Sequence, residues 1–287
     1  MTDGTLYVVA TPIGNRDDLA PRARDILRCV DIVASEDTRR TGRLLSHFGI
    51  AAGQVALHEH NESQVSERLV AQLQRGESVA LVSDAGTPLI SDPGYRLLTL
   101  AHAAGIRVSP LPGPSALTAA LSVCGLPTDR FCFEGFLPAK ARAGRKRLTA
   151  LEGETRTLVF YEAVHRVREM LEDLDNAFGA DREGFIGREL SKLHEQCVRA
   201  SLGELAAMLA DGRIPLKGEF VVIVAGRDGD PATHLDTDRL LGLLLPLMPQ
   251  RQAVDIVTAA SGQRRNEVYR RMLELRHDDP TPGPDNS

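Results

Sequence analysis

The sequence predicts an α/β protein in which two sheet-forming halves are followed by a short helical module. In the first 225 residues, short apolar stretches of strand length alternate with longer stretches in which apolar residues recur at helical spacing. Tryptophan is absent and aromatic residues make up only 4% of the chain, so the core must be built from aliphatic side chains. The last expected strand is followed by a Gly- and Asp-rich stretch and then by helical patterns only.

The first half is expected to form a mostly parallel sheet with helices on both faces. Its strands are apolar throughout rather than alternating, which is typical of strands that are buried on both sides. The expected strands are residues 6–10, 31–34, 55–57, 78–82 and 106–111. The expected helices between them are residues 20–30, 38–48, 63–75 and 95–104.

The second half continues the alternation, but its later strands follow one another closely, which favours a mixed sheet. The expected strands are residues 130–134, 156–161, 184–188, 194–200 and 219–225. The expected helices are residues 115–123, 143–151, 164–178 and 202–210.

The C-terminal part is expected to be helical after a linker at residues 226–237. Its expected helices are residues 238–247, 250–260 and 264–275, and the Gly-containing join at 259–264 resembles a helix-turn-helix turn. We therefore expect an N-terminal α/β domain at residues 1–114, a second α/β domain at 115–227, a helical module at 238–276 and a disordered tail at 277–287.

The composition excludes several classes of protein. With 43% hydrophobic and 25% charged residues, the chain is neither disordered nor fibrous. No apolar run approaches the ~20 residues that span a bilayer, and no signal peptide is visible, so a cytoplasmic protein is expected. The four cysteines are scattered without a C-x-x-C pair, so we expect neither a disulfide framework nor a bound metal. The net charge of −5 gives no general indication of nucleic-acid binding, which would have to use local basic patches.

The loops that follow the strands of a parallel sheet are the usual places for ligand binding. The loop at residues 11–15 lacks the G-x-G-x-x-G pattern, so an ordinary dinucleotide or P-loop site is not supported. The loop at residues 35–39 combines acids and bases at a helix start, where Asp37 or Thr38 can act simply as a helix cap.

The loop at residues 83–94 is the most informative one. It has twelve residues, whereas an ordinary connection has ~2–6, so its length favours a binding loop. Asp84 could accept a hydrogen bond from a ribose hydroxyl or an amine, and Gly86 allows a ligand to approach the backbone closely. Asp92 can be explained as a cap of the next helix.

Charged residues also follow strands in the second half. Lone histidines such as His165 and His194 are more often structural than catalytic. Lys217 and Glu219 precede a strongly apolar strand, and charges in such a place need partners, which favours a functional role.

A basic run lies near the middle of the chain, with five basic residues in eight positions and no acid: Lys140, Arg142, Arg145, Lys146 and Arg147. It is either a solvated helix face or a clamp for phosphate groups. Residues 236–276 contain seven arginines against five acids, and Arg264 and Arg265 are the candidates there for contacts with RNA phosphates.

Several stretches resemble the ribosomal RNA small-subunit methyltransferase I family of the tetrapyrrole-methylase-like superfamily. They occur in family order and are LYVVATPIGN (6–15), SEDTR (35–39), HEHNE (58–62), VSDAGTPLISDPG (82–94), LPGPSA (111–116), GFLP (135–138), FYEAVHR (160–166), RELSKLHE (188–195) and KGEFV (217–221). The departures are Arg16 for a usual Leu, Ala163 and Val164 for Ser-Pro, and Ser191 for Thr. The replacement of Ser-Pro could alter the local turn, because the Pro is lost, but it removes no ionisable group.

The resemblance implies an S-adenosyl-L-methionine-dependent enzyme that methylates the ribose 2′-hydroxyl of a cytidine in the decoding region of 16S ribosomal RNA, within the small subunit. It also implies a homodimer of chains with two α/β domains and the cofactor in the cleft between them. By this resemblance the cofactor is bound by Pro12, Asp84, Ala85, Gly86, Thr87, Ser115, Ala116, Tyr161, Leu190 and Gly218.

The chemistry requires that donor and nucleophile be aligned, and that the proton of the ribose hydroxyl be accepted or its developing charge stabilised. The candidates are Glu36, Asp37, Glu162, His165, Glu189, Lys192 and His194, of which we favour Glu36, Glu189, Lys192 and His194. Two other functions stay open. A tetrapyrrole methyltransferase would share the fold and cofactor, and a non-catalytic RNA-binding factor in ribosome assembly would retain only the fold.

Overall fold

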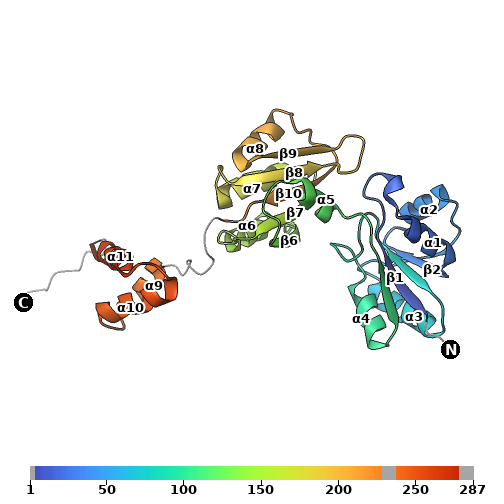
Figure 1. The fold of residues 1–287 in the computed structure, drawn as a ribbon, viewed down its shortest axis with the longest axis horizontal. Helices are drawn as coiled ribbons and strands as arrows, with labels where there is room; N and C mark the ends of the chain where they lie inside the picture. The colour runs from blue at the N-terminus through green and yellow to red at the C-terminus, as the bar shows by residue number, and fades with distance from the viewer. Residues whose placement is uncertain (1–3, 228–236, 278–287) are drawn as a thin grey trace, which may run out of the picture. The chain divides into compact units, whose positions relative to one another are not determined.

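The computed structural model describes residues 4–227 and 237–277, which divide into two units (Figure 1). The larger unit consists of Met1–Thr149 with Thr157–Ala225, and the smaller one of Ala150–Arg156 with Gly226–Ser287. Most of the expected linker at 226–237 and nearly all of the expected tail at 277–287 lie outside the described residues.

The first sheet is entirely parallel, with the strand order β3-β2-β4-β1-β5. Its strands are β1 (Thr5–Val9), β2 (Ile32–Ser35), β3 (Gly53–Ala56), β4 (Val79–Val82) and β5 (Arg107–Leu111). All four residues of β4, in the centre, are buried. The strand order reverses between β4 and β1, and such a switch point opens a crevice at the carboxyl ends of the two strands.

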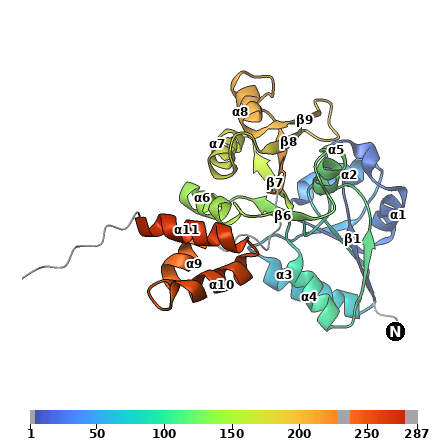
Figure 2. The same cartoon turned by 60° about the vertical axis from the view of Figure 1, so that its left-hand side comes forward.

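Helices cover both faces of this sheet (Figure 1, Figure 2). They are α1 (Pro21–Cys29), α2 (Thr38–His47), α3 (Glu62–Gln74) and α4 (Tyr95–Ala103). Leu69 of α3 and Leu97 of α4 belong to one buried cluster, while Leu27 of α1 and Leu45 of α2 belong to another. The aliphatic core and the parallel sheet are therefore as predicted.

The second sheet is mixed, as predicted, with the order β6-β7-β10-β8-β9. Its strands are β6 (Phe131–Phe136), β7 (Thr157–Ala163), β8 (Glu183–Arg188), β9 (Gln196–Ser201) and β10 (Glu219–Val224). Only the β6–β7 pair is parallel among these described strands. The helices of this half are α5 (Ala116–Val123), α6 (Ala141–Ala150), α7 (Val167–Phe178) and α8 (Leu202–Ala210).

Strand alternation divides the second sheet into two faces. Phe185 of β8 packs in a cluster with Leu117 of α5, whereas the neighbouring Gly184 lies against Leu202 and Leu205 of α8. Side chains of β7 and β10 that point to this face, such as Tyr161 and Val221, therefore pack on the same side of the sheet as α5.

The smaller unit contains three helices in its described residues, α9 (Thr237–Leu244), α10 (Gln250–Ser261) and α11 (Arg265–His277). They share a small core that includes Leu241, Val257 and Met272. Gly262 ends α10 in the left-handed conformation with φ of 67°, which agrees with the helix-turn-helix-like join expected there.

The observed elements differ from the predicted ones mainly at their ends. A short 3₁₀ helix, η1 (Arg16–Asp18), forms where a loop was expected, because the Asn15 side chain accepts a hydrogen bond from the Asp17 N–H. Helix α7 begins at Val167 rather than residue 164, and β6 extends to Phe136 through a bulge at Gly135. Local turn and bulge geometry thus shifted these boundaries.

Candidate functional site

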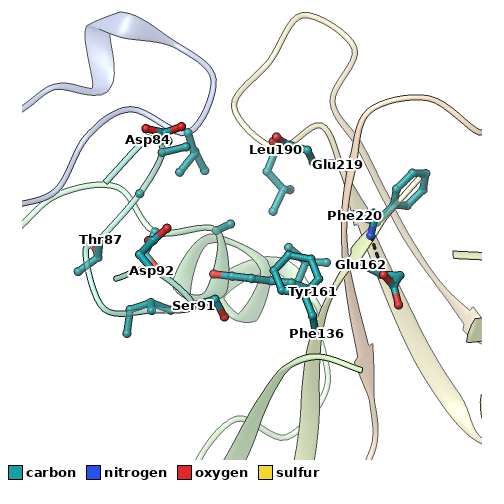
Figure 3. Close-up of a pocket in the computed structure, with 18 of the residues that line it drawn as sticks. Asp84, Thr87, Ser91, Asp92, Phe136, Tyr161, Glu162, Leu190, Glu219 and Phe220 are labelled. Carbon is teal, nitrogen blue, oxygen red and sulfur yellow. Dashed lines mark hydrogen bonds between the residues drawn. The ribbon is translucent and has the colours of Figure 1, made fainter. Parts of the chain in front are cut away.

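A cavity of about 460 Å³ lies at the carboxyl ends of β1 and β4, within the size range of small-molecule sites. The loops that follow strands of the first sheet, the start of α5 and residues of the second sheet contribute to its wall. Its lining residues are Ile13, Glu36, Arg40, Asp84, Ala85, Gly86, Thr87, Ile90, Ser91, Asp92, Ser115, Ala116, Phe136, Tyr161, Glu162, Ala163, Gly187, Leu190, Glu219, Phe220 and Val221. Figure 3 shows Asp84 and Asp92 across the cavity from Tyr161.

The loop after β4 is tied to the loop after β1. Thr11 and Gly86 exchange two backbone hydrogen bonds, with N···O distances of 2.8 and 3.0 Å. The Ser83 hydroxyl also donates to the Gly86 carbonyl at 2.8 Å. Gly86 has φ of +89°, a conformation that glycine adopts without steric cost. The Thr87 hydroxyl donates to the Pro114 carbonyl at 3.0 Å, so the long loop is also bonded to the loop after β5.

Asp84 connects this loop to the loop after β2. Its carboxylate accepts from the Asp37 N–H at 3.0 Å and pairs with the Arg40 guanidinium at 3.2 Å. Asp37 itself accepts from the Arg39 N–H and so caps α2, which confirms the capping interpretation of Asp37. The Asp84 carboxylate is thus fixed in the cavity wall by partners at the start of α2.

Asp92 faces the same cavity instead of capping α4. The first turn of α4 is capped by Glu62 of α3, whose carboxylate accepts from the N–H groups of Gly94 and Arg96 at 3.0 and 2.9 Å. The interpretation of Asp92 as a helix cap is therefore wrong. Burial, together with the charges of Glu36 and Asp84, raises the pKa of Asp92 from its ordinary value of 3.8 to about 7.

Tyr161 forms the opposite wall. Its hydroxyl accepts a hydrogen bond from the Leu117 N–H at 3.0 Å, which connects β7 to the first turn of α5. Burial raises the pKa of the Tyr161 hydroxyl. Phe133 and Phe136 contact the Tyr161 ring edge to face, with centroid distances of 4.9 and 5.8 Å.

A three-residue ionic network borders the cavity next to Leu190. The Lys192 ammonium lies 2.7 Å from Glu189 and 2.8 Å from Glu219, and the Glu219 N–H donates to Glu189 at 2.9 Å. Burial of Glu189 opposes its ionisation, but the bonds from Lys192 and the Glu219 N–H outweigh burial and lower the pKa of Glu189. Burial likewise lowers the pKa of Lys192, but the two carboxylates outweigh it and raise that pKa. A Lys192 that stays protonated is suited to stabilising negative charge rather than to accepting a proton.

The backbone around this network is in the left-handed region. Glu189 and Ser191 have φ of 51° and 64°, and Gly218 has φ of 89°. A Cβ added at Gly218 would lie 2.3 Å from the Glu189 side chain, so only glycine fits there without rearrangement. The Ser191 hydroxyl donates to the Asp18 carboxylate, which joins this segment to the first half of the chain.

The cavity brings together most of the site residues predicted from the sequence. The predicted residues in its wall are Glu36, Asp84, Ala85, Gly86, Thr87, Ser115, Ala116, Tyr161 and Leu190. Pro12, Glu189, Lys192 and Gly218 are not in the wall but lie within two residues of it in the sequence. His194 is exposed, and the structure uses its carbonyl, which accepts from Arg188 at 2.9 Å.

Two other candidate proton acceptors, Glu162 and His165, do not direct their ionisable groups into the cavity. Glu162 contributes to the wall, but its carboxylate is drawn on the side of β7 away from Tyr161 (Figure 3). This is the expected result of strand alternation. His165 is exposed. Asp92 and Phe136 are wall residues that the sequence argument did not select as site residues.

The basic run lies on α6 and just before it, and all five of its side chains are exposed. Arg147 pairs with Glu134 at 2.6 Å, and Arg145 pairs with Asp173 at 3.8 Å. Lys140, Arg142 and Lys146 form no ion pair with the residues that the structure describes. In the smaller unit Arg264 is exposed and Arg265 pairs with Asp255 at 2.8 Å.

In residues 4–227 and 237–277 no three His, Cys, Asp or Glu side chains are grouped so that they could bind a metal ion. None of the helices described there is long and apolar enough to cross a bilayer.

Comparison with known proteins identifies the family. Residues 5–206 match the family described as Tetrapyrrole (Corrin/Porphyrin) Methylases, and residues 231–276 match the RsmI C-terminal HTH domain. A protein of Xylella fastidiosa named Ribosomal RNA small subunit methyltransferase I is 52% identical over 93% of this chain and 98% of its own length. The chain belongs to the ribosomal RNA small subunit methyltransferase I family. A protein of the same name from Pseudomonas aeruginosa is 50% identical over 96% of this chain and 98% of its own length.

A solved structure shares the fold of this family. Uroporphyrin-III C-methyl transferase from Thermus thermophilus, complexed with S-adenyl homocysteine, has a TM-score of 0.53 and 18% identity. The match covers 77% of this chain and 97% of that chain. As a member of this methylase family, the chain uses S-adenosyl-L-methionine as its methyl donor.

The residues of the cavity fit such a donor. The donor carries a positive sulfonium, and the wall supplies the carboxylates of Glu36, Asp84 and Asp92. Its ribose hydroxyls need acceptors, which the same carboxylates provide. The backbone around Gly86, which has no side chain, leaves room for a ligand to approach closely.

The raised pKa of Asp92 makes a prediction about stability. Its pKa is higher in the folded state than in the unfolded state, so the folded state loses stability as pH rises from about 4 through about 7. Asp92→Asn removes this effect. In urea denaturation followed by circular dichroism, the variant should therefore gain stability relative to the unmodified chain over this pH range.

The control is Asp129→Asn, which removes a carboxylate from an exposed site outside the cavity. A difference between Asp92→Asn and the unmodified chain that stays constant from pH 4 to pH 8 would contradict the raised pKa of Asp92.

Proposed function

We propose that the protein transfers a methyl group from S-adenosyl-L-methionine to the ribose 2′-hydroxyl of a cytidine in the decoding region of 16S ribosomal RNA. The observation that carries this proposal is the similarity over almost the whole chain, 93% and 96% of it, to two proteins named for methylation of small-subunit ribosomal RNA. The similarity includes the C-terminal module, which residues 231–276 match separately.

The donor is bound in this proposal by the loops at the carboxyl ends of the first sheet and by the facing second sheet. The contacts are assigned to Pro12, Asp84, Ala85, Gly86, Thr87, Ser115, Ala116, Tyr161, Leu190 and Gly218. The bonds between Thr11 and Gly86 hold these loops in place before the ligand arrives. When bound, the donor supplies an activated methyl group, so the protein's main task is alignment.

Glu36 is the best placed of the proposed proton acceptors, because it lines the cavity. The Lys192 network borders it, and its ammonium is suited to stabilising charge on the ribose oxygen. Glu189 holds Lys192, since the two groups are 2.7 Å apart. His194, the fourth catalytic residue proposed from the sequence, has the least support, because its side chain is exposed and is not part of the cavity wall.

The RNA is proposed to contact the basic run and the C-terminal module at Arg264 and Arg265. Phosphate contacts of this kind fix the position of an RNA without reading its sequence. We further propose that residues 1–114, 115–227 and 238–276 act as three domains and that the enzyme works in the cytoplasm as a homodimer.

The main alternative is a methyltransferase acting on a tetrapyrrole, which the shared fold of uroporphyrin-III C-methyl transferase keeps open. The deciding assay measures transfer of a tritiated methyl group to purified small ribosomal subunits and to a precorrin-type tetrapyrrole. The proposal requires label in the subunit RNA. Label in the tetrapyrrole alone would replace it with the alternative, and binding of the donor without transfer to either would favour a non-catalytic factor.

Asp84→Ala tests the donor site. The change removes the carboxylate that holds Arg40 and the Asp37 N–H, so the affinity for S-adenosylmethionine should fall at least ~10-fold, or about 1.4 kcal/mol. Calorimetric titration measures it. Asp211→Ala is the matched control, because it breaks an Asp–Arg pair of 2.8 Å on the surface. Equal affinities of Asp84→Ala and the unmodified chain would remove Asp84 from the site.

Replacing Lys140, Arg142 and Lys146 together by Ala tests the basic run. Because these three cations have no ion pair among the described residues, they are the free members of the run. The variant should bind small-subunit RNA more weakly, with a slope of log K against log salt shallower by about 2 to 3, and should bind the donor normally.

The matched control replaces Arg22, Arg43 and Arg68, three exposed arginines on α1, α2 and α3, and so changes the net charge equally. An identical salt slope for the two triple variants would mean that the run is only a solvated helix face.

Truncation after Arg227 tests the C-terminal module. This cut retains the hydrogen bond from the Arg227 N–H to the Glu154 carbonyl at 2.8 Å. Donor affinity should stay within ~2-fold, and methylation of the subunit should fall ~10-fold or more through lost phosphate contacts. Full methylation would exclude RNA docking by the module, and loss of donor binding would show that the module supports the donor site.

A further inference from the structure

Phe136 is a large aromatic side chain left half exposed at the edge of the cavity. It is 53% exposed and yet lines the cavity wall. Its ring meets the ring of Tyr161 edge to face, at a centroid distance of 5.8 Å and an interplanar angle of 67°. Figure 3 places both on the side of the cavity opposite Asp84 and Asp92. One part of the Phe136 ring thus contacts Tyr161, and another part is exposed to solvent.

A β-bulge just before Phe136 sets its position along the strand. The β6–β7 register shifts between Phe133 and Gly135, and Gly135 has φ of 64°. A Cβ at Gly135 would lie 3.2 Å from the Ser91 hydroxyl, so the bulge sits close against the long loop after β4. The bulge brings Phe136 into register with Tyr161.

The backbone on the carboxyl side of Phe136 is clamped. The Arg166 guanidinium donates to the carbonyls of Leu137 and Pro138, both at 3.1 Å. Arg166 in turn lies 3.7 Å from the carboxylate of Glu162, whose side chain is fully buried. Arg166 thus connects Glu162 of β7 to the segment after Phe136 through its two hydrogen bonds and this ion pair.

Three exposed cations that form no ion pair with the residues that the structure describes follow Phe136, four to ten residues later in the chain. Lys140, Arg142 and Lys146 come after the clamped segment, and their side chains are exposed. Single-stranded nucleotides are bound by exposed aromatic rings, which stack on the bases, together with cations, which contact the phosphates.

We propose that Phe136 is the residue on which the base of the target nucleotide stacks when its ribose enters the cavity. The inference rests on the proposed function, since it requires an RNA substrate. A nucleotide whose 2′-hydroxyl must reach the donor has to leave its stack in the RNA, and stacking on a protein ring compensates for part of that loss. Phe136 is therefore assigned to substrate positioning, and the carboxylates across the cavity to the donor.

The experiment compares Phe136→Leu and Phe136→Tyr with the full-length unmodified chain. Methyl transfer to small subunits gives kcat and KM, and calorimetry gives the affinity for S-adenosylmethionine. Phe136→Leu keeps an apolar side chain but loses the planar ring, so kcat/KM for the subunit should fall about 10- to 100-fold, the scale of one lost base–aromatic contact. Phe136→Tyr should restore it to within ~3-fold, because tyrosine also stacks.

The matched control is Phe131→Leu, at the other end of the same strand, where the ring is 41% exposed and is not part of the cavity wall. Its kcat/KM and donor affinity should equal those of the unmodified chain. The affinity of Phe136→Leu for S-adenosylmethionine should also be unchanged.

Three results would overturn the inference. They are full activity of Phe136→Leu, failure of Phe136→Tyr to restore activity, and a loss of donor affinity in Phe136→Leu, which would mean that the ring contacts the donor instead. Each of them leaves the proposed function intact if the unmodified chain methylates the subunit RNA. Absence of that activity in the unmodified chain would instead overturn both.

Discussion

The two backbone hydrogen bonds between Thr11 and Gly86 are the interaction on which the rest of the site depends. They join the loops after β1 and β4, the neighbouring strands at which the order of the first sheet reverses. With Gly86 fixed, Asp84 reaches the Asp37 N–H and Arg40, which brings in the loop after β2. Three loops that are far apart in the sequence thereby become one wall.

The site departs from ordinary folding preferences in two places. Glu36, Asp84 and Asp92 place three carboxylates around one cavity, where burial and then the charges of Glu36 and Asp84 raise the pKa of Asp92. Glu189 and Ser191 hold left-handed backbone conformations beside the Lys192 network. Such departures cost stability and are expected where a structure is adapted to a ligand rather than to packing. A cationic methyl donor accounts for the first, because it would offset the carboxylate charges.

Much of the fold could be predicted from the sequence, because apolar periodicity is a local property. The fully apolar β4 and the closely spaced late strands indicated a parallel and a mixed sheet respectively, and both formed. The unusual length of residues 83–94 correctly identified the loop that lines the cavity. Most of the predicted donor contacts came from the family resemblance, and the cavity brings most of them together.

The remaining features depend on contacts that no local pattern reveals. Asp92 looked like a cap for α4, but Glu62, some thirty residues earlier, took that role. Arg145 and Arg147 belong to a run without acids in the sequence, but in the fold they pair with Asp173 and Glu134 from other elements. Phe136 lies beyond the strand expected at residues 130–134, because the bulge through which β6 reaches it forms only in the pairing with β7.

The proposed transfer of a methyl group in this cavity to a ribose oxygen of ribosomal RNA is tested most directly by nucleoside analysis. Small subunits are incubated with the enzyme and isotopically labelled S-adenosylmethionine. Their RNA is then digested to nucleosides and analysed by mass spectrometry. We expect label in 2′-O-methylcytidine, with the added mass on the sugar fragment. Label on a base fragment, or in a nucleoside other than cytidine, would contradict it.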